Sequence, residues 1–156
     1  MDKWIFQLKL RNRSGVLLSL TSLFADRGIS IESLTAHAGV WPGPACGTAI
    51  LTFAASPAKK DHLARLLGRL AAVQELTEYR YEDAAHARKS ALARVTLGAD
   101  ELTSGLPPGV LCDIVSAEGG YTLALLLGPP HLLDTTLDGL AARGALLEVD
   151  STVIVV

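Results

Sequence analysis

The sequence is poor in the residues that build disulfide frameworks and metal centres. Its two cysteines, Cys46 and Cys112, lie far apart and in no C-x-x-C pattern, so we expect small buried or loop residues rather than a disulfide or a metal pair. Four histidines stand at positions without a metal-binding spacing: His37, His62, His86 and His131. The sequence therefore predicts neither a metal site nor a bound cofactor.

Signatures of catalysis and of nucleotide binding are missing as well. Neither G-x-G-x-x-G nor G-x-x-x-x-G-K-[ST] occurs, which argues against a phosphate-binding loop. No G-x-S-x-G pattern frames Ser14 as a nucleophile. The acidic residues show no pairing suited to acid–base work. We therefore expect no catalytic residue, and a regulatory or binding protein rather than an enzyme.

The chain also lacks a strong net charge and a long apolar run. Its net charge of −2 creates no field that would attract nucleic acid or an anionic membrane. The longest apolar run, over residues 121–127, has the length of a strand. The first ten residues alternate like a strand and contain no signal-peptide core. With 49% hydrophobic residues, we expect a folded cytoplasmic protein without a nucleic-acid or membrane partner.

The most informative pattern lies in residues 12–34. A short polar turn, Asn12–Gly15, follows an apolar strand. Apolar residues then recur at the spacing of one buried helix face: Val16, Leu20, Leu23 and Phe24. Gly28 provides the residue that tolerates a left-handed helix end. The segment thus predicts a turn, a helix over residues 16–26 and a strand over residues 29–37.

The first half of the chain alternates strands and helices in a recognisable order. Strands are predicted over residues 4–10, 29–37, 48–54 and 73–81. A second helix begins at Ser56-Pro57, with an apolar stripe of Leu63, Leu66, Leu67 and Leu70. The glycine- and proline-rich segment 39–47 is predicted to be a loop. The resulting order, strand-helix-strand-strand-helix-strand, is that of the ferredoxin-like fold, an antiparallel sheet with two helices on one face.

The second half repeats this order in a shortened form. Strands are predicted over residues 89–97, 110–116, 121–127 and 146–156, and a helix after Pro129-Pro130 contains Leu133, Leu137 and Leu140. Pro57 and Pro130 occupy equivalent places, which indicates an internal duplication. Pro107-Pro108 leaves room for only about one helical turn in the segment that replaces the first helix. We therefore predict an α+β protein of two tandem βαββαβ domains, over residues 1–83 and 84–156.

Several of these residues resemble a known family. The pattern Asn12-x-x-Gly15-Val16-Leu17, followed by Arg27-Gly28 and by Ile31-Glu32-Ser33-Leu34, is similar to the N-terminal ACT domain of the acetolactate synthase small (regulatory) subunit. The segment 88–95 resembles the strand that opens the C-terminal domain of that family. The resemblance is specific over residues 8–34 and faint beyond residue 84. It implies that both domains are of the ACT type.

The resemblance also implies a function. Members of this family are dimeric regulators that bind a branched-chain amino acid, usually valine, and adjust a separate thiamine-diphosphate catalytic subunit. Carried over to this sequence, Asn12 would hydrogen-bond the effector. Backbone N–H groups near Gly15, Val16 and Leu17 would hold its carboxylate. Ser30 would come from the partner protomer, so that the pocket would lie across a homodimer interface.

Physical chemistry supports such a site at the start of the helix. The helix dipole stabilises a carboxylate there by roughly 0.3–1 kcal/mol, and each oriented hydrogen bond adds about 1 kcal/mol. Val16 and Ile31 would form an apolar wall for the ligand's side chain. Selection among valine, leucine and isoleucine would be weak, because one methylene discriminates by only about 1–3 kcal/mol.

Three other interpretations remain open. The first is a free-standing ACT sensor with another ligand and client, which is favoured by Cys46-Gly47 where the family has Ser-Arg. The second is a dimerisation module without a ligand, in which Asn12 and Gly15 only form a turn and a helix cap. The third, a small ferredoxin-like enzyme, requires a catalytic constellation that the sequence does not show.

Overall fold

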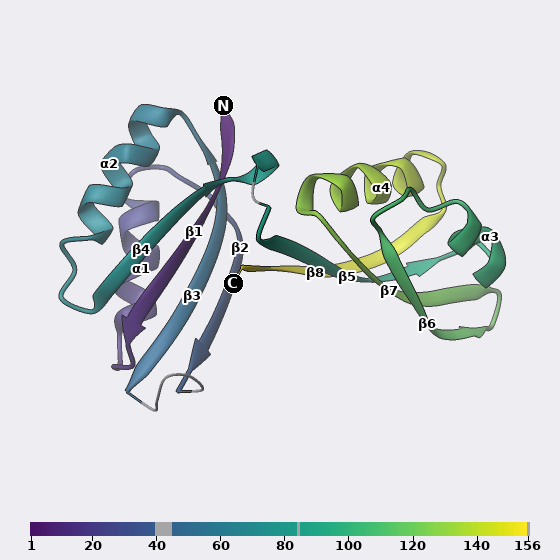
Figure 1. Cartoon of the computed structure of the whole chain (residues 1–156), viewed down its shortest axis with the longest axis horizontal. Helices are drawn as coiled ribbons and strands as arrows, with labels where there is room; N and C mark the ends of the chain where they lie inside the picture. The colour runs from purple at the N-terminus through teal and green to yellow at the C-terminus, as the bar shows by residue number, and fades with distance from the viewer. Residues whose placement is uncertain (40–44, 84, 156) are drawn as a thin grey trace. The chain divides into compact units, whose positions relative to one another are not determined.

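The computed structural model describes residues 1–39, 45–83 and 85–155, and the chain divides into two compact units, Met1–Ala84 and Ala85–Val156 (Figure 1). No helix in the described residues is both long enough and apolar enough to cross a membrane. Most of the predicted loop 39–47, including Trp41, lies outside the described residues. Its last two residues were predicted wrongly, because Cys46 and Gly47 already belong to a strand.

The first unit has the predicted order of elements. They are β1 (Asp2–Arg11), α1 (Val16–Ala25), β2 (Ile31–Ala38), β3 (Cys46–Ala55), α2 (Pro57–Leu67), β4 (Val73–Arg80) and the short helix η1 (Tyr81–Asp83). The sheet order is β2-β3-β1-β4, and every neighbouring pair is antiparallel. Figure 1 shows α1 and α2 together on one face of this sheet.

The second unit repeats this arrangement. Its elements are β5 (Ala87–Val95), α3 (Ala99–Ser104), β6 (Leu111–Glu118), β7 (Tyr121–Gly128), α4 (Pro130–Ala142) and β8 (Leu146–Val155). The sheet order β6-β7-β5-β8 corresponds strand for strand to that of the first unit. Helix α3 has six residues where α1 has ten. The predicted fold class, two βαββαβ units with a shortened first helix in the second, is therefore confirmed.

Helix α2 begins as its sequence predicts, but its apolar stripe is narrower. The side chain of Ser56 accepts a hydrogen bond from the Lys59 N–H at 3.4 Å, and Pro57 occupies the first turn, where its missing N–H costs nothing. Of the four predicted core leucines, two are fully buried: Leu63 and Leu67. Leu66 is only half-buried, and Leu70 lies beyond the end of the helix but packs against the core.

Three phenylalanines fill the centre of the first unit. Phe6 and Phe53 pack edge to face with ring centroids 4.8 Å apart, and Phe24 of α1 packs on Phe53 at 5.1 Å. Edge-to-face pairs contribute about 0.5–1.5 kcal/mol beyond the area they bury. Helix α1 is thereby held against the central strands, which positions its N-terminus above one end of the sheet.

A β-bulge determines which residues of β2 face the helices. The register of β2 against β3 shifts between Ile31 and Ser33, so Ile31 and Leu34 both face the helix layer although they are an odd number of positions apart. The same face continues through Ala36 and Ala38. Along this face, the side chains therefore change from large to small towards the end of the strand.

Candidate functional site

A cavity of about 430 Å³ lies between the start of α1 and the end of β2. Its walls come from the turn after β1, the first turn of α1, the last residues of β2 and the first residues of β3. The buried side chain of Leu10 forms part of its lining. Four of the residues predicted to bind an effector line this cavity: Asn12, Gly15, Val16 and Leu17.

Small residues on the helix-facing side of the sheet create the cavity. Ala36 pairs with Ala49, and Ala38 pairs with Gly47, so no large side chain fills the space beneath the start of α1. Gly47 is also needed for close strand pairing, because a Cβ built on it would lie 3.0 Å from the carbonyl oxygen of His37. Ala36, Ala38 and Gly47 were not among the residues predicted to form the site. The alternation of small residues at 36 and 38 was the available signal.

The N-terminus of α1 presents backbone N–H groups to this space. Gly15 occupies the cap position with a φ of 82°, a left-handed conformation that other residues rarely adopt. Among the described residues, no side chain caps this end of the helix, and its first turn contains no acidic residue. Val16 donates its N–H to the Arg13 carbonyl at 3.4 Å. The N–H of Leu17, in the first turn, has no acceptor within the helix, and this arrangement suits an anion.

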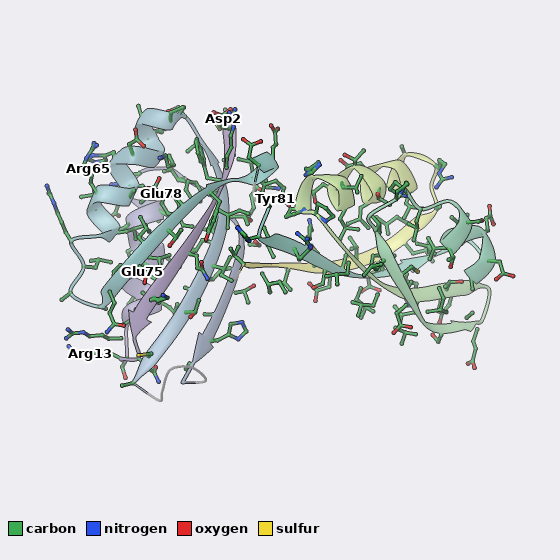
Figure 2. All side chains as sticks on the ribbon, in the orientation of Figure 1. Asp2, Arg13, Arg65, Glu75, Glu78 and Tyr81 are labelled. Atoms are coloured by element: carbon green, nitrogen blue, oxygen red, sulfur yellow. The ribbon has the colours of Figure 1, made fainter. Side chains whose placement is uncertain are left out.

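Basic residues around the cavity do not fill it with charge. Strand side chains alternate between the two faces of a sheet, and Leu10 and Ala36 face the helices. By this alternation, the side chains of Arg11 and His37 belong to the other face of the sheet. Figure 2 shows Arg13 extending away from the turn before α1. The interior is thus apolar, with polar groups concentrated at the turn and the helix start.

The structure does not bring all predicted site residues together within one chain. Ser30 is exposed and immediately precedes β2, and Ile31 begins that strand and packs against the core. The cavity lies at the opposite end of β2, near Ala38. A contribution of Ser30 from a partner protomer stays a prediction.

The side of the first unit next to the cavity is apolar and exposed. Strand β2 is an edge of the sheet, and α1 has no charged residue among its ten. Its side chains Leu17 and Leu18 are 43% and 70% exposed, and Leu34 of β2 is 38% exposed. An edge strand beside an apolar helix face is a typical interaction surface.

In the described residues, neither a metal-binding cluster nor a group with a shifted pKa lies at this cavity. In the part of the chain that the structure describes, no group of three or more His, Cys, Asp or Glu residues could hold a metal ion. Burial raises the pKa of the Cys112 thiol. Burial tends to lower the pKa of Lys60, but hydrogen bonds to Asp61 and Glu78 outweigh this effect and raise it. None of these residues lines the cavity.

Comparisons with known proteins bear on the fold. No protein-family model and no curated protein sequence matches the chain. The structure is similar to the acetolactate synthase small subunit from Thermotoga maritima, with a TM-score of 0.75, 16% identity and coverage of 100% of this chain and 97% of that chain.

Two weaker similarities are to regulatory subunits of aspartate kinase. The one from Thermus thermophilus has a TM-score of 0.47 and 12% identity over 90% of this chain and 91% of that chain. The one from Thermus flavus has a TM-score of 0.48 and 13% identity over 92% and 94%. Both scores are below 0.5, so the fold assignment rests on the Thermotoga structure. The chain has two tandem ferredoxin-like domains, and its fold is similar to that of the acetolactate synthase small subunit over its whole length.

Proposed function

We propose that this chain is a non-catalytic regulatory protein that binds a branched-chain amino acid, such as valine, and modulates a partner enzyme. The observation that carries the proposal is the cavity of about 430 Å³ at the start of α1, which is lined by Asn12, Gly15, Val16 and Leu17. In this proposal, residues 1–83 form the sensing ACT domain. Residues 84–156 form a degenerate ACT-type domain.

The cavity's chemistry matches a small zwitterion with an aliphatic side chain. The open first turn of α1 offers N–H groups and a partial positive charge to a carboxylate. Asn12 is the single asparagine of the sequence, and its side chain carries both donors and an acceptor. Val16 and Leu10 provide apolar walls. An amino acid would therefore bind with its carboxylate at the helix and its side chain towards the sheet.

A second copy of the chain would complete the site. Strand β2 is an edge strand, and two such strands related by a two-fold axis would pair antiparallel. That pairing would bring Ser30 and Ile31 of the partner subunit close to Ala36 and Ala38, where the cavity lies. The uncharged α1, with Leu17 and Leu18 exposed, would be covered in the same dimer. The proposed site therefore forms between subunits.

Regulation requires that the effector bind two states of the assembly with different affinity. A ligand shared by two subunits meets this condition, because it binds only when the subunits are correctly paired. By analogy with the acetolactate synthase small subunit, the proposed client is a thiamine-diphosphate catalytic subunit in the cytoplasm. A free-standing sensor with another client is the second candidate. It is favoured by Gly47, which lines the cavity where the resemblance implies an arginine.

Thermal unfolding in the presence of each of the twenty amino acids tests the proposal. The sequence has two tryptophans, Trp4 and Trp41, both in the first unit, so tryptophan fluorescence reports on that unit alone. An effector present at 100 times its dissociation constant would stabilise the folded unit by about 2.7 kcal/mol. We expect valine, leucine or isoleucine to raise the midpoint and Asn12→Ala to remove the effect.

Gln74→Ala is the matched control, because Gln74 is an exposed amide side chain on β4 outside the cavity. It should leave the response unchanged. A midpoint that no amino acid moves would contradict the proposal and favour a dimerisation module without a ligand. Co-purification with a thiamine-diphosphate enzyme would favour that enzyme as the client over the free-standing sensor with another client.

A further inference from the structure

The second unit has a hollow of its own between its two helices. A smaller hollow, of about 310 Å³, lies in the first unit between the start of α1 and the residues that follow α2. A groove of about 440 Å³ separates α3 from α4. It is lined mainly by apolar side chains, among them Leu97, Leu102, Leu106 and Leu132. The groove lies in the helix layer of the second unit, and none of its lining residues belongs to the effector site proposed above.

The groove follows from the lengths of the two helices. Helix α3 ends after six residues, at Ser104, whereas α4 continues for thirteen. Helix α4 has a buried face that packs on the sheet, formed by Leu133, Leu137 and Leu140. A second stripe, offset from the first, faces the groove and contains Leu132, Thr136, Gly139 and Arg143. The short α3 leaves this second stripe uncovered.

Gly139 keeps the groove open at its centre. It lies inside α4, where glycine costs about 1 kcal/mol relative to alanine. No close approach requires it, because a Cβ built on Gly139 would meet no atom within 4 Å. Its backbone is not in the left-handed region either. The physical effect of this glycine is therefore to leave space between Thr136 and Arg143 on the groove wall.

One end of the groove carries an acid and a base. The βαββαβ topology runs α3 and α4 in opposite directions, so the first turn of α3, with Glu101, lies beside the last turn of α4, with Arg143. Both residues line the groove and are exposed. Within residues 1–39, 45–83 and 85–155, neither forms an ion pair. Arg143 directs only its Nε to the Gly139 carbonyl, at 3.4 Å.

The rest of the wall is apolar despite its threonines. Thr135 and Thr136 donate their hydroxyl groups to carbonyl oxygens of their own helix, those of His131 and Leu132, at 2.9 and 2.8 Å. The groove thus combines two opposite charges at one end with a leucine-rich surface along its length.

We propose that the groove between α3 and α4 binds a free α-amino acid with a branched aliphatic side chain, as a second site independent of the one at α1. The ligand's ammonium group would bind to Glu101 and its carboxylate to Arg143, in charge-assisted hydrogen bonds. Its side chain would pack against Leu102, Leu106 and Leu132. Because the groove lies within one unit, this site needs no second copy of the chain.

Methyl-detected NMR of the full chain, with labelled leucine side chains, tests the proposal directly. Addition of L-leucine at millimolar concentration should shift the methyl signals of Leu102, Leu106 and Leu132. Two analogues test the charges: 4-methylpentanoate lacks the ammonium group, and 3-methylbutylamine lacks the carboxylate. Each should bind at least about tenfold more weakly, because it loses one charge-assisted hydrogen bond.

Variants locate the site by a second method. By calorimetry, Gly139→Leu should abolish binding at the groove, because the new side chain occupies its centre, and Glu101→Gln or Arg143→Gln should weaken it by about tenfold. Asp138→Asn, on the same helix but outside the groove lining, is the control and should bind as the wild type does. Asn12→Ala removes the site at α1, so the two sites are measured separately.

If L-leucine did not shift the methyl signals of the groove leucines in the wild-type chain, the proposal would be overturned, even if an amino acid bound at α1. Equal binding of the two analogues would also overturn it, because the groove would then be only an apolar surface. Loss of binding in Asn12→Ala together with full binding in Gly139→Leu would place all amino-acid binding in the first unit and refute a second site.

Discussion

The two units share one topology but place their open space differently. In the first unit, α1 has ten residues and opens on Gly15, and the cavity lies between that helix and the sheet edge. In the second unit, α3 has six residues and opens on Gly98, and the groove lies between the two helices. The shorter α3 accompanies the larger hollow in the helix layer, about 440 Å³, whereas the hollow between the start of α1 and the residues after α2 is about 310 Å³.

The cores of the two units also differ in the size of their side chains. The first unit packs three phenylalanines between helices and sheet: Phe6, Phe24 and Phe53. Among the described residues, the core cluster of the second unit has no aromatic side chain, and its central strands contribute Ala91, Ala93 and Ala124. Large aromatic side chains contribute most of the energy of the core that they fill. The first unit should therefore lose more stability when its core is truncated.

Substitution of equivalent core residues should change the free energy of unfolding of the two units most. Phe53 and Leu126 each precede the proline that begins the next helix by four residues, and both are fully buried. We expect Phe53→Ala to lower the free energy of unfolding of the first unit by about 3–5 kcal/mol, and Leu126→Ala to lower that of the second by about 2–5 kcal/mol. Urea unfolding followed by tryptophan fluorescence and by circular dichroism measures both.

Tryptophan fluorescence should detect a shifted unfolding transition only for Phe53→Ala, because both tryptophans lie in the first half of the chain. If Leu126→Ala moved the fluorescence transition as far as the circular dichroism transition, the two units would unfold as one, and their cores would not be independent.

The same substitution at the glycines that precede α1 and α3 should change the stability of the two units in opposite directions. Gly15 has a φ of 82°, whereas Gly98 has a φ of −66° and a ψ of 158°, and neither has an atom within 4 Å of a built Cβ. Gly15→Ser should destabilise its unit by roughly 1–2 kcal/mol, because the left-handed conformation is strained for serine. Gly98→Ser should stabilise its unit by roughly 0.5 kcal/mol, because serine caps a helix and restricts the unfolded chain.

Thermal unfolding of the two serine variants measures this contrast without interference from side-chain packing. A loss of stability in both variants would show that the start of α3 also depends on glycine, contrary to its extended conformation.

The ion pairs that link a helix to the sheet in each unit, through Lys60 in the first and Lys89 in the second, should have the smallest effect. Lys60 contacts Asp61 and Glu78, each at 2.5 Å, and Lys89 contacts Asp134 at 2.5 Å. We expect Lys60→Met to cost about 1 kcal/mol at neutral pH and Lys89→Met to cost less than that, because such pairs contribute little. Denaturant unfolding at several pH values gives the comparison.

The Lys60 contribution should depend on pH in a defined direction. The folded state raises the pKa of Lys60, so its stabilising effect is fully present below the ordinary lysine pKa of about 10.4 and is lost as the pH rises above it. Wild-type and Lys60→Met proteins should therefore converge in stability at strongly alkaline pH. A difference that stayed constant through that range would show that the methylene chain of Lys60, rather than its charge, stabilises the unit.

Local signals predicted most of the fold. The cap at Ser56-Pro57, the proline pair before α4 and the apolar spacing of α1 each depend on residues within one or two turns, so the sequence shows them directly. The strands predicted over residues 110–116 and 121–127 left four residues between them, but β6 extends through Glu118 and leaves only Gly119 and Gly120, both at positive φ, as the turn. Such two-residue glycine turns match the twist of a hairpin.

Strand ends were predicted less well, because pairing with distant residues decides them. Cys46 and Gly47 follow a glycine- and proline-rich segment, and local composition assigned them to the loop. They belong to β3 because they pair with Arg11 and Leu10 of β1, which lie more than thirty positions away. No local pattern reveals that partner.

The sequence by itself determined the order of elements, the duplication and the turn with Asn12 and Gly15, because these depend on the periodicity and chemistry of neighbouring residues. Only the tertiary structure decided where the chain is hollow. The β2 bulge directs Ala36 and Ala38 towards the helices, and the short α3 leaves Gly139 facing open space. Empty volume arises where segments far apart in the sequence fail to fill the space between them, so it is a property of packing that no single segment encodes.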